Sequence, residues 1–202
     1  MTVAGVLLAA GRSQRMGRPK ALLPFHGKTL LHHAVRTLCA TACSPRIVVV
    51  SREVEEESCW LRDGVDIALV VNPDPLRGLS SSLRVALDAI EACEQTEAGA
   101  RVEGILITLV DQPLVTPDHL EAILQAGAAT GLAASSWPGA FGPPTFLYRS
   151  FFAALRELRG DEGAKKILQA NRDGVRLVDY PEAAQDIDDP AAYERLLSGA
   201  KA

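Results

Sequence analysis

Four basic side chains crowd a short glycine-containing segment near the start of the chain. In the run LAAGRSQRMGRPKALLPF, residues 8–25, these cations are Arg12, Arg15, Arg18 and Lys20. Positive charges this close repel one another. The chain as a whole is acidic, with a formal net charge of -4, so the basic cluster is a local feature. We therefore expect an anionic ligand to bind among these side chains.

The same segment contains small residues that suit a phosphate-binding turn. Ala9, Ala10 and Gly11 follow a hydrophobic stretch directly, and they allow backbone N–H groups to approach phosphate oxygens. Arg15 and Lys20 would then neutralise a polyphosphate.

Two familiar phosphate-binding motifs are absent. Five residues separate Gly11 from Gly17, and Arg18-Pro19 follows, so the pattern G-x-x-x-x-G-K-[ST] is not met. The pattern G-x-G-x-x-G is missing too, which disfavours a dinucleotide. On spacing alone, a solvated basic turn between a strand and a helix remains the alternative.

Carboxylates stand at two distant points where they would suit a metal ion. Asp111 follows the nearly all-apolar stretch Gly104–Val110, which is typical of a strand buried on both faces. Mg²⁺ binds through one or two carboxylates plus substrate phosphates, so Asp111 is a candidate ligand. Its alternative role is to cap the turn into a helix that starts near Pro117.

The second acidic run precedes the last predicted helix. In an extended DIDDP segment, residues 186–190, alternation would send Asp186 and Asp188 to one side and Ile187 to the other. Asp189 stands just before Pro190, which is typical of a helix N-cap. Asp186 and Asp188 therefore both remain candidate metal ligands.

A loop rich in proline, glycine and serine lies between these motifs. Residues 72–83 read NPDPLRGLSSSL, in which the prolines and Gly78 shape a loop and the serines offer hydroxyls at a helix N-terminus. Capping accounts for one serine, but three in a row exceed what a cap needs. Gly78, Ser81 and Ser82 are therefore candidate binding residues.

Short apolar stretches alternate with helical patterns along the chain. We expect strands at Val3–Leu8, Arg46–Ser51, Asp66–Asn72, Gly104–Val110, Leu132–Trp137, Pro144–Tyr148 and Val175–Tyr180. We expect helices at Thr29–Leu38, from Glu53, and at Ser80–Cys93, Pro117–Ala126, Ser150–Leu158, Glu162–Ala170 and Pro190–Leu197. This alternation predicts one domain over residues 1–202, an α/β/α sandwich of three layers with a mostly parallel sheet. Ligands bind such sheets at the carboxyl ends of the strands.

Composition narrows the class of protein. The 202 residues are 48% hydrophobic and 23% charged, as in an ordinary globular domain, and the acidic balance disfavours nucleic acid as a partner. The N-terminus lacks a positive region and a long apolar span, so we expect a cytoplasmic protein without a membrane segment. Cys39, Cys43, Cys59 and Cys93 form no C-x-x-C pair, which predicts reduced, mostly buried thiols.

The first loop resembles the signature of a known family. Leu8-Ala9-Ala10-Gly11-x-Ser13-x-Arg15-Met16-Gly17-x-x-Lys20-x-Leu22-Leu23 is similar to the signature of the MobA-like nucleotidyltransferases, and most similar to the molybdenum cofactor cytidylyltransferase (MocA-like) branch. The resemblance implies the Rossmann-like fold of nucleotide-diphospho-sugar transferases. It also implies a loop that wraps the base and triphosphate of a nucleotide. The implied nucleotide-binding residues here are Leu8, Ala9, Ala10, Gly11, Ser13, Arg15 and Lys20.

Three further segments extend the resemblance. Residues 72–83 are similar to the N-P-x-x-x-x-G-x-x-S-S-L segment, which implies that Asn72, Gly78, Ser81 and Ser82 help to bind the nucleotide. Asp111-Gln112-Pro113 resembles the D-x-P metal motif, and residues 186–190 resemble D-[IV]-[DN]-T-P, whose middle acid is Asp188 here. Asp189 replaces the family's threonine. The resemblance thus implies Mg²⁺ held by Asp111 and Asp188, with Lys20, Arg15 and Asp111 as the catalytic residues.

The second half offers weaker matches. The segment FGPPTF, residues 141–146, resembles G-x-P-x-x-F, and GDEGAK, residues 160–165, resembles G-D-x-G-A-[RK]. Both also suit ordinary turns and helix starts. The resemblance makes Gly142, Pro144, Asp161 and Gly163 candidates for binding an acceptor, with residues from about 1 to 115 as the nucleotide-binding half and those from about 116 to 202 as the acceptor-binding half.

Together the motifs predict nucleotidyl transfer. The expected reaction moves CMP from CTP onto a phosphate-bearing small molecule, molybdopterin or molybdenum cofactor, and releases pyrophosphate. Alternatives within enzymes are transfer to a sugar, methylerythritol or choline phosphate, with CTP or another nucleotide as donor. A different class is a non-catalytic nucleotide-binding protein that assists the maturation of molybdenum hydroxylases. The resemblance also allows a transient contact with a molybdoenzyme.

Overall fold

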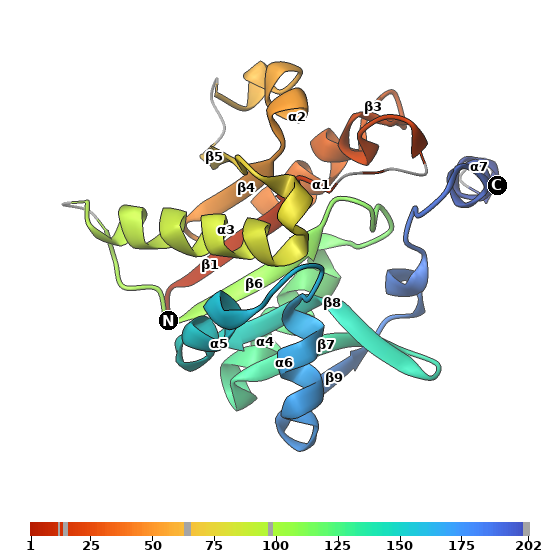
Figure 1. Cartoon of the computed structure of the whole chain (residues 1–202). Coiled ribbons are helices and arrows are strands. Elements are labelled where there is room, and N and C mark those ends of the chain that lie inside the picture. The colour runs from red at the N-terminus through yellow and green to blue at the C-terminus, as the bar shows by residue number, and fades with distance from the viewer. Residues whose placement is uncertain (12, 14–15, 63–65, 97–98, 200–202) are drawn as a thin grey trace.

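A seven-stranded mixed sheet runs through the molecule (Figure 1). The computed structural model describes residues 1–202 except 12, 14–15, 63–65, 97–98 and 200–202. The strand order is β5-β4-β1-β6-β8-β7-β9. The strands are β1 Val3–Ala9, β4 Arg46–Val50, β5 Ala68–Val71, β6 Gly104–Leu109, β7 Leu132–Trp137, β8 Ala140–Tyr148 and β9 Arg176–Asp179. A small hairpin, β2 Pro24–Phe25 with β3 Lys28–Thr29, stands apart from the sheet.

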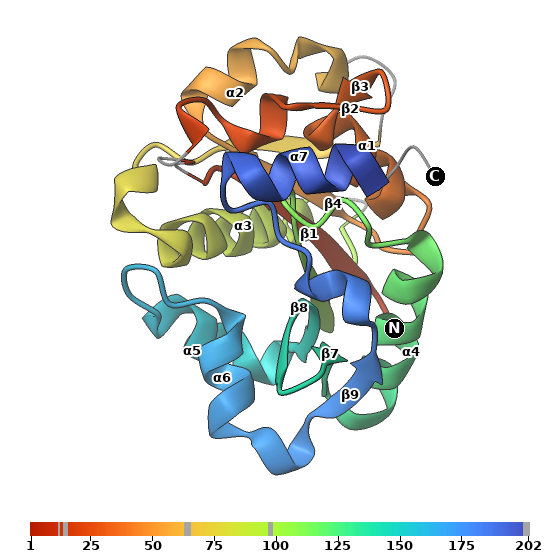
Figure 2. The same cartoon turned by 90° about the vertical axis from the view of Figure 1, so that its right-hand side faces the viewer.

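Helices cover both faces of the sheet. They are α1 Leu30–Cys39, α2 Arg52–Glu56, α3 Leu79–Glu94, α4 Pro117–Thr130, α5 Phe152–Glu157, α6 Ala164–Ala170 and α7 Pro190–Gly199. Figure 2 shows α3, α5 and α6 on one side of the strands and α4 on the other. The prediction of a three-layer α/β sandwich with a mostly parallel sheet is confirmed.

The central strands are apolar because both of their faces are buried. Every residue of β1 is buried, and β1 pairs in parallel with both β4 and β6. Alternate side chains enter two cores. Leu7 packs with the residues of α1 and α4, while Val6 and Leu8 pack with those of α3, α5 and α6. This arrangement fixes the carboxyl ends of β1 and β6 side by side.

One strand opposes the others, and it begins earlier than its sequence suggests. β8 pairs antiparallel with both β6 and β7, and it starts at Ala140 rather than at Pro144. The β7–β8 register jumps from Ala134↔Thr145 to Ser135↔Gly142, so the two intervening prolines lie in an irregularity of the ladder. Proline cannot donate to a ladder, which is why a bulge suits this point.

The predicted capping role of the serine run is wrong. α3 begins at Leu79, one residue before the run, and its N-cap is Gly78, with no side-chain cap hydrogen bond. Ser80, Ser81 and Ser82 lie inside the first turns and are buried. Their hydroxyls are therefore available for other contacts.

The cysteines only partly match expectation. Cys39, Cys43 and Cys93 are free thiols, but only Cys43 is fully buried. The side chain of Cys59 lies outside the described part of the chain. Burial raises the pKa of the Cys43 thiol above its ordinary value, which keeps it protonated and unreactive at neutral pH. In the described part of the chain, every helix is too short or too polar to cross a bilayer.

His119, near the start of α4, is a buried histidine with a defined hydrogen bond. Its ring stacks on Tyr180 with centroids 3.8 Å apart, and its Nε2 lies 2.7 Å from Ser135 Oγ. Ser135 donates its own hydroxyl hydrogen to Pro144 O, so Nε2–H must donate to Ser135 in neutral His119. Burial lowers the pKa of His119 to about 4.

We expect His119 to weaken the fold in acid. The pKa is about 4 in the folded chain and about 6.5 unfolded, so the unfolded state binds a proton first as pH falls. The contribution of neutral His119 to the free energy of unfolding is fully present above pH 6.5. As the pH falls from 6.5 to 4, about 3 kcal/mol of this contribution is lost. Chemical denaturation of the wild type and His119→Gln at pH 7 and pH 4 measures the loss. An equal acid loss in the variant contradicts this assignment.

Candidate functional site

A cleft of about 450 Å³ opens at the carboxyl ends of β1 and β6. It collects most of the residues that the sequence motifs single out. Its lining includes Leu8, Ala9, Ala10, Gly11, Ser13, Lys20, Gly78, Ser82, Asp111, Asp161 and Asp188. Pro75 and Leu79 also line it, and no motif had pointed to them.

The turn after β1 is organised by Ser13. Its hydroxyl accepts a hydrogen bond from the backbone N–H of Lys20 at 2.8 Å, and its carbonyl accepts from the N–H of Met16 at 2.8 Å. A Cβ added at Gly11 would meet nothing within 4 Å, so space for a ligand lies beside this backbone. Ser13 therefore shapes the loop that follows β1 as well as lining the cleft.

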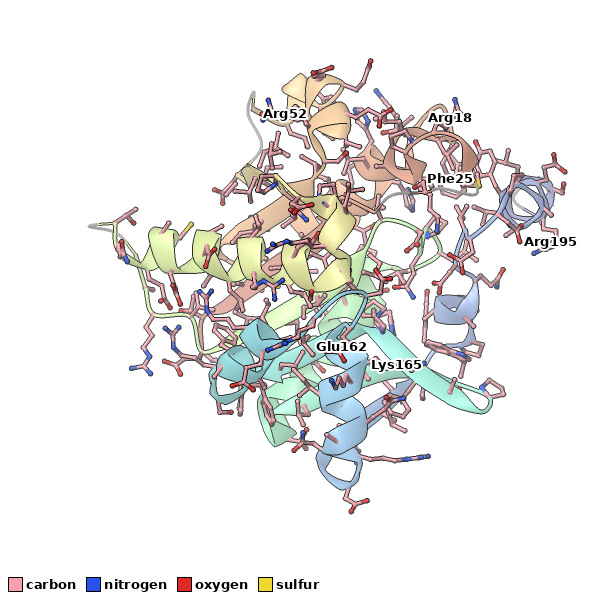
Figure 3. All side chains as sticks on the ribbon, viewed as in Figure 1. Arg18, Phe25, Arg52, Glu162, Lys165 and Arg195 are labelled. Carbon is pink, nitrogen blue, oxygen red and sulfur yellow. The ribbon has the colours of Figure 1, made fainter. Side chains whose placement is uncertain are left out.

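The four cations of the first loop differ in position. Lys20 enters the cleft, whereas Arg18 is exposed and makes no ion pair within the part of the chain that the structure describes. Figure 3 shows Arg18 in the upper part of the molecule, as it does Phe25 of β2. Arg12 and Arg15 lie outside the described residues, so the predicted phosphate contact of Arg15 stays a prediction.

Lys20 joins the two acidic motifs. Its Nζ lies 3.0 Å from Asp111 Oδ2 and 2.8 Å from Asp188 Oδ1. Burial lowers the pKa of Lys20, but the carboxylates of Asp111 and Asp188 outweigh that effect and leave it above its ordinary value. Lys20 is therefore protonated at neutral pH. We call these three residues the Lys20 cluster.

One backbone hydrogen bond brings the distant acids together. Asp111 follows β6, and its carbonyl accepts from the N–H of Ile187 at 3.0 Å. The side chain of Ile187 is 1% exposed, so its burial anchors the segment and leaves Asp188 free to reach Lys20. Asp189 then caps α7, because its carboxylate accepts from Ala192 N–H at 2.7 Å.

The alternative role of Asp111 as a helix cap is wrong. Thr116 caps α4 and accepts a hydrogen bond from the N–H of His119. The side chain of Asp111 has Lys20 as its hydrogen-bond partner. The carboxylate of Asp111 does not cap a helix, so it is available to bind a ligand at the end of the buried strand β6.

The Lys20 cluster fits a divalent cation. Two carboxylates from separate elements converge on one positively charged atom, and hard oxygen donors of this kind suit Mg²⁺ or Mn²⁺ when phosphates complete the coordination. No group of three or more His, Cys, Asp or Glu side chains forms a closed cage within the described ranges. The protein would thus supply only part of the coordination, as is usual for Mg²⁺ bound with a nucleotide.

Asp186 lies beside the cluster in a different environment. Its Oδ1 is buried without a hydrogen-bond partner. Burial, followed by the charge of Asp111, raises the pKa of Asp186 to about 6. Asp188 is the acid that meets Asp111 at Lys20, so the geometry favours Asp188 as the second ligand.

Asn72 organises the loop before α3. Its Nδ2 donates to Ser81 Oγ at 2.8 Å and to Ser82 Oγ at 2.9 Å, while its Oδ1 accepts from the N–H of Asp74. Asn72 is 2% exposed and does not line the cleft. Of the residues singled out in this segment, Gly78 and Ser82 line the cleft, whereas Asn72 and Ser81 support it.

A loop from the second half closes against this segment. Ser80 N–H donates to Gly160 O at 3.1 Å, and a Cβ on Gly78 would lie 2.4 Å from the Gly160 carbonyl carbon. Asp161 thereby joins the cleft. The other acceptor candidates, Gly142, Pro144 and Gly163, do not line it. No pattern in the sequence indicates that Gly160 would pack on Gly78.

Comparison with known proteins places this chain in a family. The model of the MobA-like NTP transferase domain matches residues 5–175. The purine catabolism protein PucB of Bacillus subtilis is 32% identical, over 95% of this chain and 94% of its own length. The nicotine blue oxidoreductase of Paenarthrobacter nicotinovorans is 32% identical over 96% of both chains.

A solved structure shares the whole fold. The manganese complex of Rv0371c from Mycobacterium tuberculosis H37Rv superimposes with a TM-score of 0.76 and 29% identity, covering 98% of this chain and 99% of that one. The match of the family model covers both the first loop and Asp111, which contribute to the Lys20 cluster. The chain belongs to the MobA-like NTP transferase domain family.

Proposed function

We propose that this chain is a Mg²⁺-dependent nucleotidyltransferase, with CTP as its nucleotide and a molybdopterin-type phosphate as its acceptor. The observation that carries the proposal is the Lys20 cluster at the cleft, where one cation and two convergent carboxylates stand beside an open glycine turn. Membership of the family supports the class of reaction. The manganese complex of Rv0371c supports a divalent ion.

The reaction balances without a strong general base. An oxygen of the acceptor's phosphate forms a bond to the α-phosphorus of the nucleotide, and the bond from that phosphorus to the bridging oxygen of the β-phosphate breaks. The nucleotide's β- and γ-phosphates leave as pyrophosphate. A phosphate nucleophile is already ionised near neutral pH, so bringing two anions together is the main difficulty. Positioning and charge neutralisation therefore dominate.

The chain's own residues have distinct roles in this proposal. The turn containing Gly11 and Ser13 places backbone N–H groups near the phosphates. Lys20 stabilises the charge that develops on the departing pyrophosphate. Asp111 and Asp188 would hold Mg²⁺, which supplies charge neutralisation at phosphate oxygens when it is bound.

The acceptor and the cellular role have alternatives with different consequences. A sugar, methylerythritol or choline phosphate as acceptor predicts turnover with that compound instead. A maturation protein for molybdenum hydroxylases predicts nucleotide binding without turnover, together with a transient contact with a molybdoenzyme. The name of the Paenarthrobacter relative adds an oxidoreductase as a further comparison, which predicts a redox reaction and no release of pyrophosphate.

Pyrophosphate release separates these alternatives. The protein is mixed with CTP, GTP, ATP or UTP, with Mg²⁺ and with each class of acceptor. The proposal expects the greatest release with CTP and a molybdopterin acceptor. A thermal-shift panel with the same nucleotides detects binding without turnover, because a ligand of the native state raises its apparent stability. Nucleotide binding with no release from any acceptor would overturn the catalytic proposal.

Asp111→Asn tests the metal assignment. Loss of one carboxylate ligand should raise the Mg²⁺ concentration needed for half-maximal pyrophosphate release and lower the maximal rate by about 10²-fold. Asp118→Asn is the matched control, since Asp118 is exposed on α4 outside the cleft. An unchanged metal titration in Asp111→Asn would remove Asp111 from the site.

A further inference from the structure

The side chain of Asp161 is exposed and lines one wall of the cleft. We call Gly78, Leu79, Ser82 and Asp161 the Gly78 wall, since all four line the cleft and belong to segments in contact. The hydrogen bond from Ser80 N–H to Gly160 O fixes the backbone one residue before Asp161. A Cβ added at Gly78 would lie 2.5 Å from Asp161 Oδ1, so this oxygen lies directly against Gly78.

The carboxylate of Asp161 is solvent-exposed and has no protein partner among the described residues. Within the part of the chain that the structure describes, it makes no hydrogen bond and no ion pair. Lys20 is paired with Asp111 and Asp188 instead. Glu162, the next residue, is fully engaged, because it accepts from Lys166 Nζ at 2.5 Å and from Arg159 N–H at 3.0 Å. Figure 3 shows Glu162 at the turn before α6.

An unpaired carboxylate limits what lies against this wall. It accepts hydrogen bonds and cannot donate them, and its charge repels phosphate. The triphosphate therefore belongs near Lys20. The Gly78 wall is left for the nucleoside, whose flat base suits the apolar side chains of Leu8, Ala10 and Leu79. A base next to Asp161 gains a hydrogen bond from this carboxylate only if it presents a donor N–H.

Resting on the proposed function, we infer that Asp161 is a specificity residue that accepts a hydrogen bond from the amino group of cytosine and so selects CTP over UTP. Carboxylates accept from this amino group in other recognition settings. Uracil carries a carbonyl oxygen at the same ring position, and two acceptors facing each other leave both without a hydrogen bond. The two nucleotides otherwise have nearly the same shape and charge, and they differ further only at ring atom N3, which accepts a hydrogen bond in cytosine and donates one in uracil.

Paired nucleotide titrations test this role. The dissociation constants of CTP and UTP are measured with Mg²⁺ by calorimetry for the wild type, Asp161→Asn and Glu162→Gln. We expect the wild type to bind CTP at least about tenfold more tightly than UTP. Asp161→Asn should reduce this ratio to about one or reverse it, because its amide donates to the uracil carbonyl. Glu162→Gln, with the same change of charge one residue away, should keep the wild-type ratio.

The outcomes separate this inference from the proposed function. If the wild type binds neither nucleotide, the nucleotidyltransferase proposal itself fails. If both nucleotides bind but Asp161→Asn keeps the wild-type ratio, the specificity role of Asp161 is wrong while the proposed function stands. A change confined to the affinity for the phosphate acceptor would likewise overturn the inference and assign Asp161 to the acceptor. Thermal melting of each variant shows whether it is folded.

Discussion

Lys20→Met is expected to lower the rate of pyrophosphate release by about 10²–10³-fold and to strengthen metal binding measured without nucleotide. The loss of rate follows from removing the cation that faces the departing pyrophosphate. The gain in metal affinity follows because Lys20 Nζ lies within 3.0 Å of both Asp111 and Asp188. A cation that binds these carboxylates must therefore displace the ammonium group. Kinetic assays and a titration with Mn²⁺ measure the two effects separately.

A matched variant at another lysine shows whether the two effects are specific to Lys20. Lys28→Met removes an exposed lysine on β3, outside the cleft, and should change neither quantity. Methionine keeps much of the length and apolar contact of the lysine stem, so the variant should remain folded by circular dichroism. A folded Lys20→Met protein with full activity would exclude Lys20 from the reaction. Weaker Mn²⁺ binding would show that Lys20 does not compete with the metal.

Gly78→Ala is expected to lower the free energy of unfolding by about 3 kcal/mol and to abolish nucleotide binding. Gly78 has φ +80° and ψ -174°, a region almost exclusive to glycine. A Cβ would also lie 2.4 Å from the backbone of Gly160 and 2.5 Å from Asp161 Oδ1. The added methyl group must push the two segments apart. Chemical denaturation and calorimetric titration with CTP measure the two losses.

Another glycine supplies the control for Gly78. Gly174→Ala places a methyl group where nothing lies within 4 Å, at a residue without a positive φ. This variant should keep wild-type stability and nucleotide binding. If Gly78→Ala were as stable as Gly174→Ala, the contact between Gly78 and Gly160 would be unimportant for the fold.

Local sequence patterns predicted the layers and the main strands. The apolar stretch that became β6 lies between two neighbours in the sheet, and the turn after β1 combines small residues with cations. Both signals lie within a few consecutive residues. The cap formed by Asp189 was predicted correctly for the same reason, because a cap depends on the next three residues.

Contacts between distant segments were not predictable in the same way. Nothing local indicated that Gly160 would pack on Gly78, or that Asn72 would use the serine hydroxyls. The capping assignment for the serines was wrong because helix α3 starts one residue earlier than the serine pattern suggests. The division into nucleotide-binding and acceptor-binding halves stays a prediction.

The hydrogen bond between Ile187 and Asp111 has a consequence for the order of folding. The four strands β5, β4, β1 and β6 all precede residue 110, so this part of the sheet can assemble from the chain's earlier portion alone. Asp188 reaches Lys20 only after the later strands are in place and Ile187 has docked. A nascent chain therefore lacks Asp188, and with it the full pair of proposed metal ligands, until the segment around Ile187 has been synthesised and has docked on Asp111.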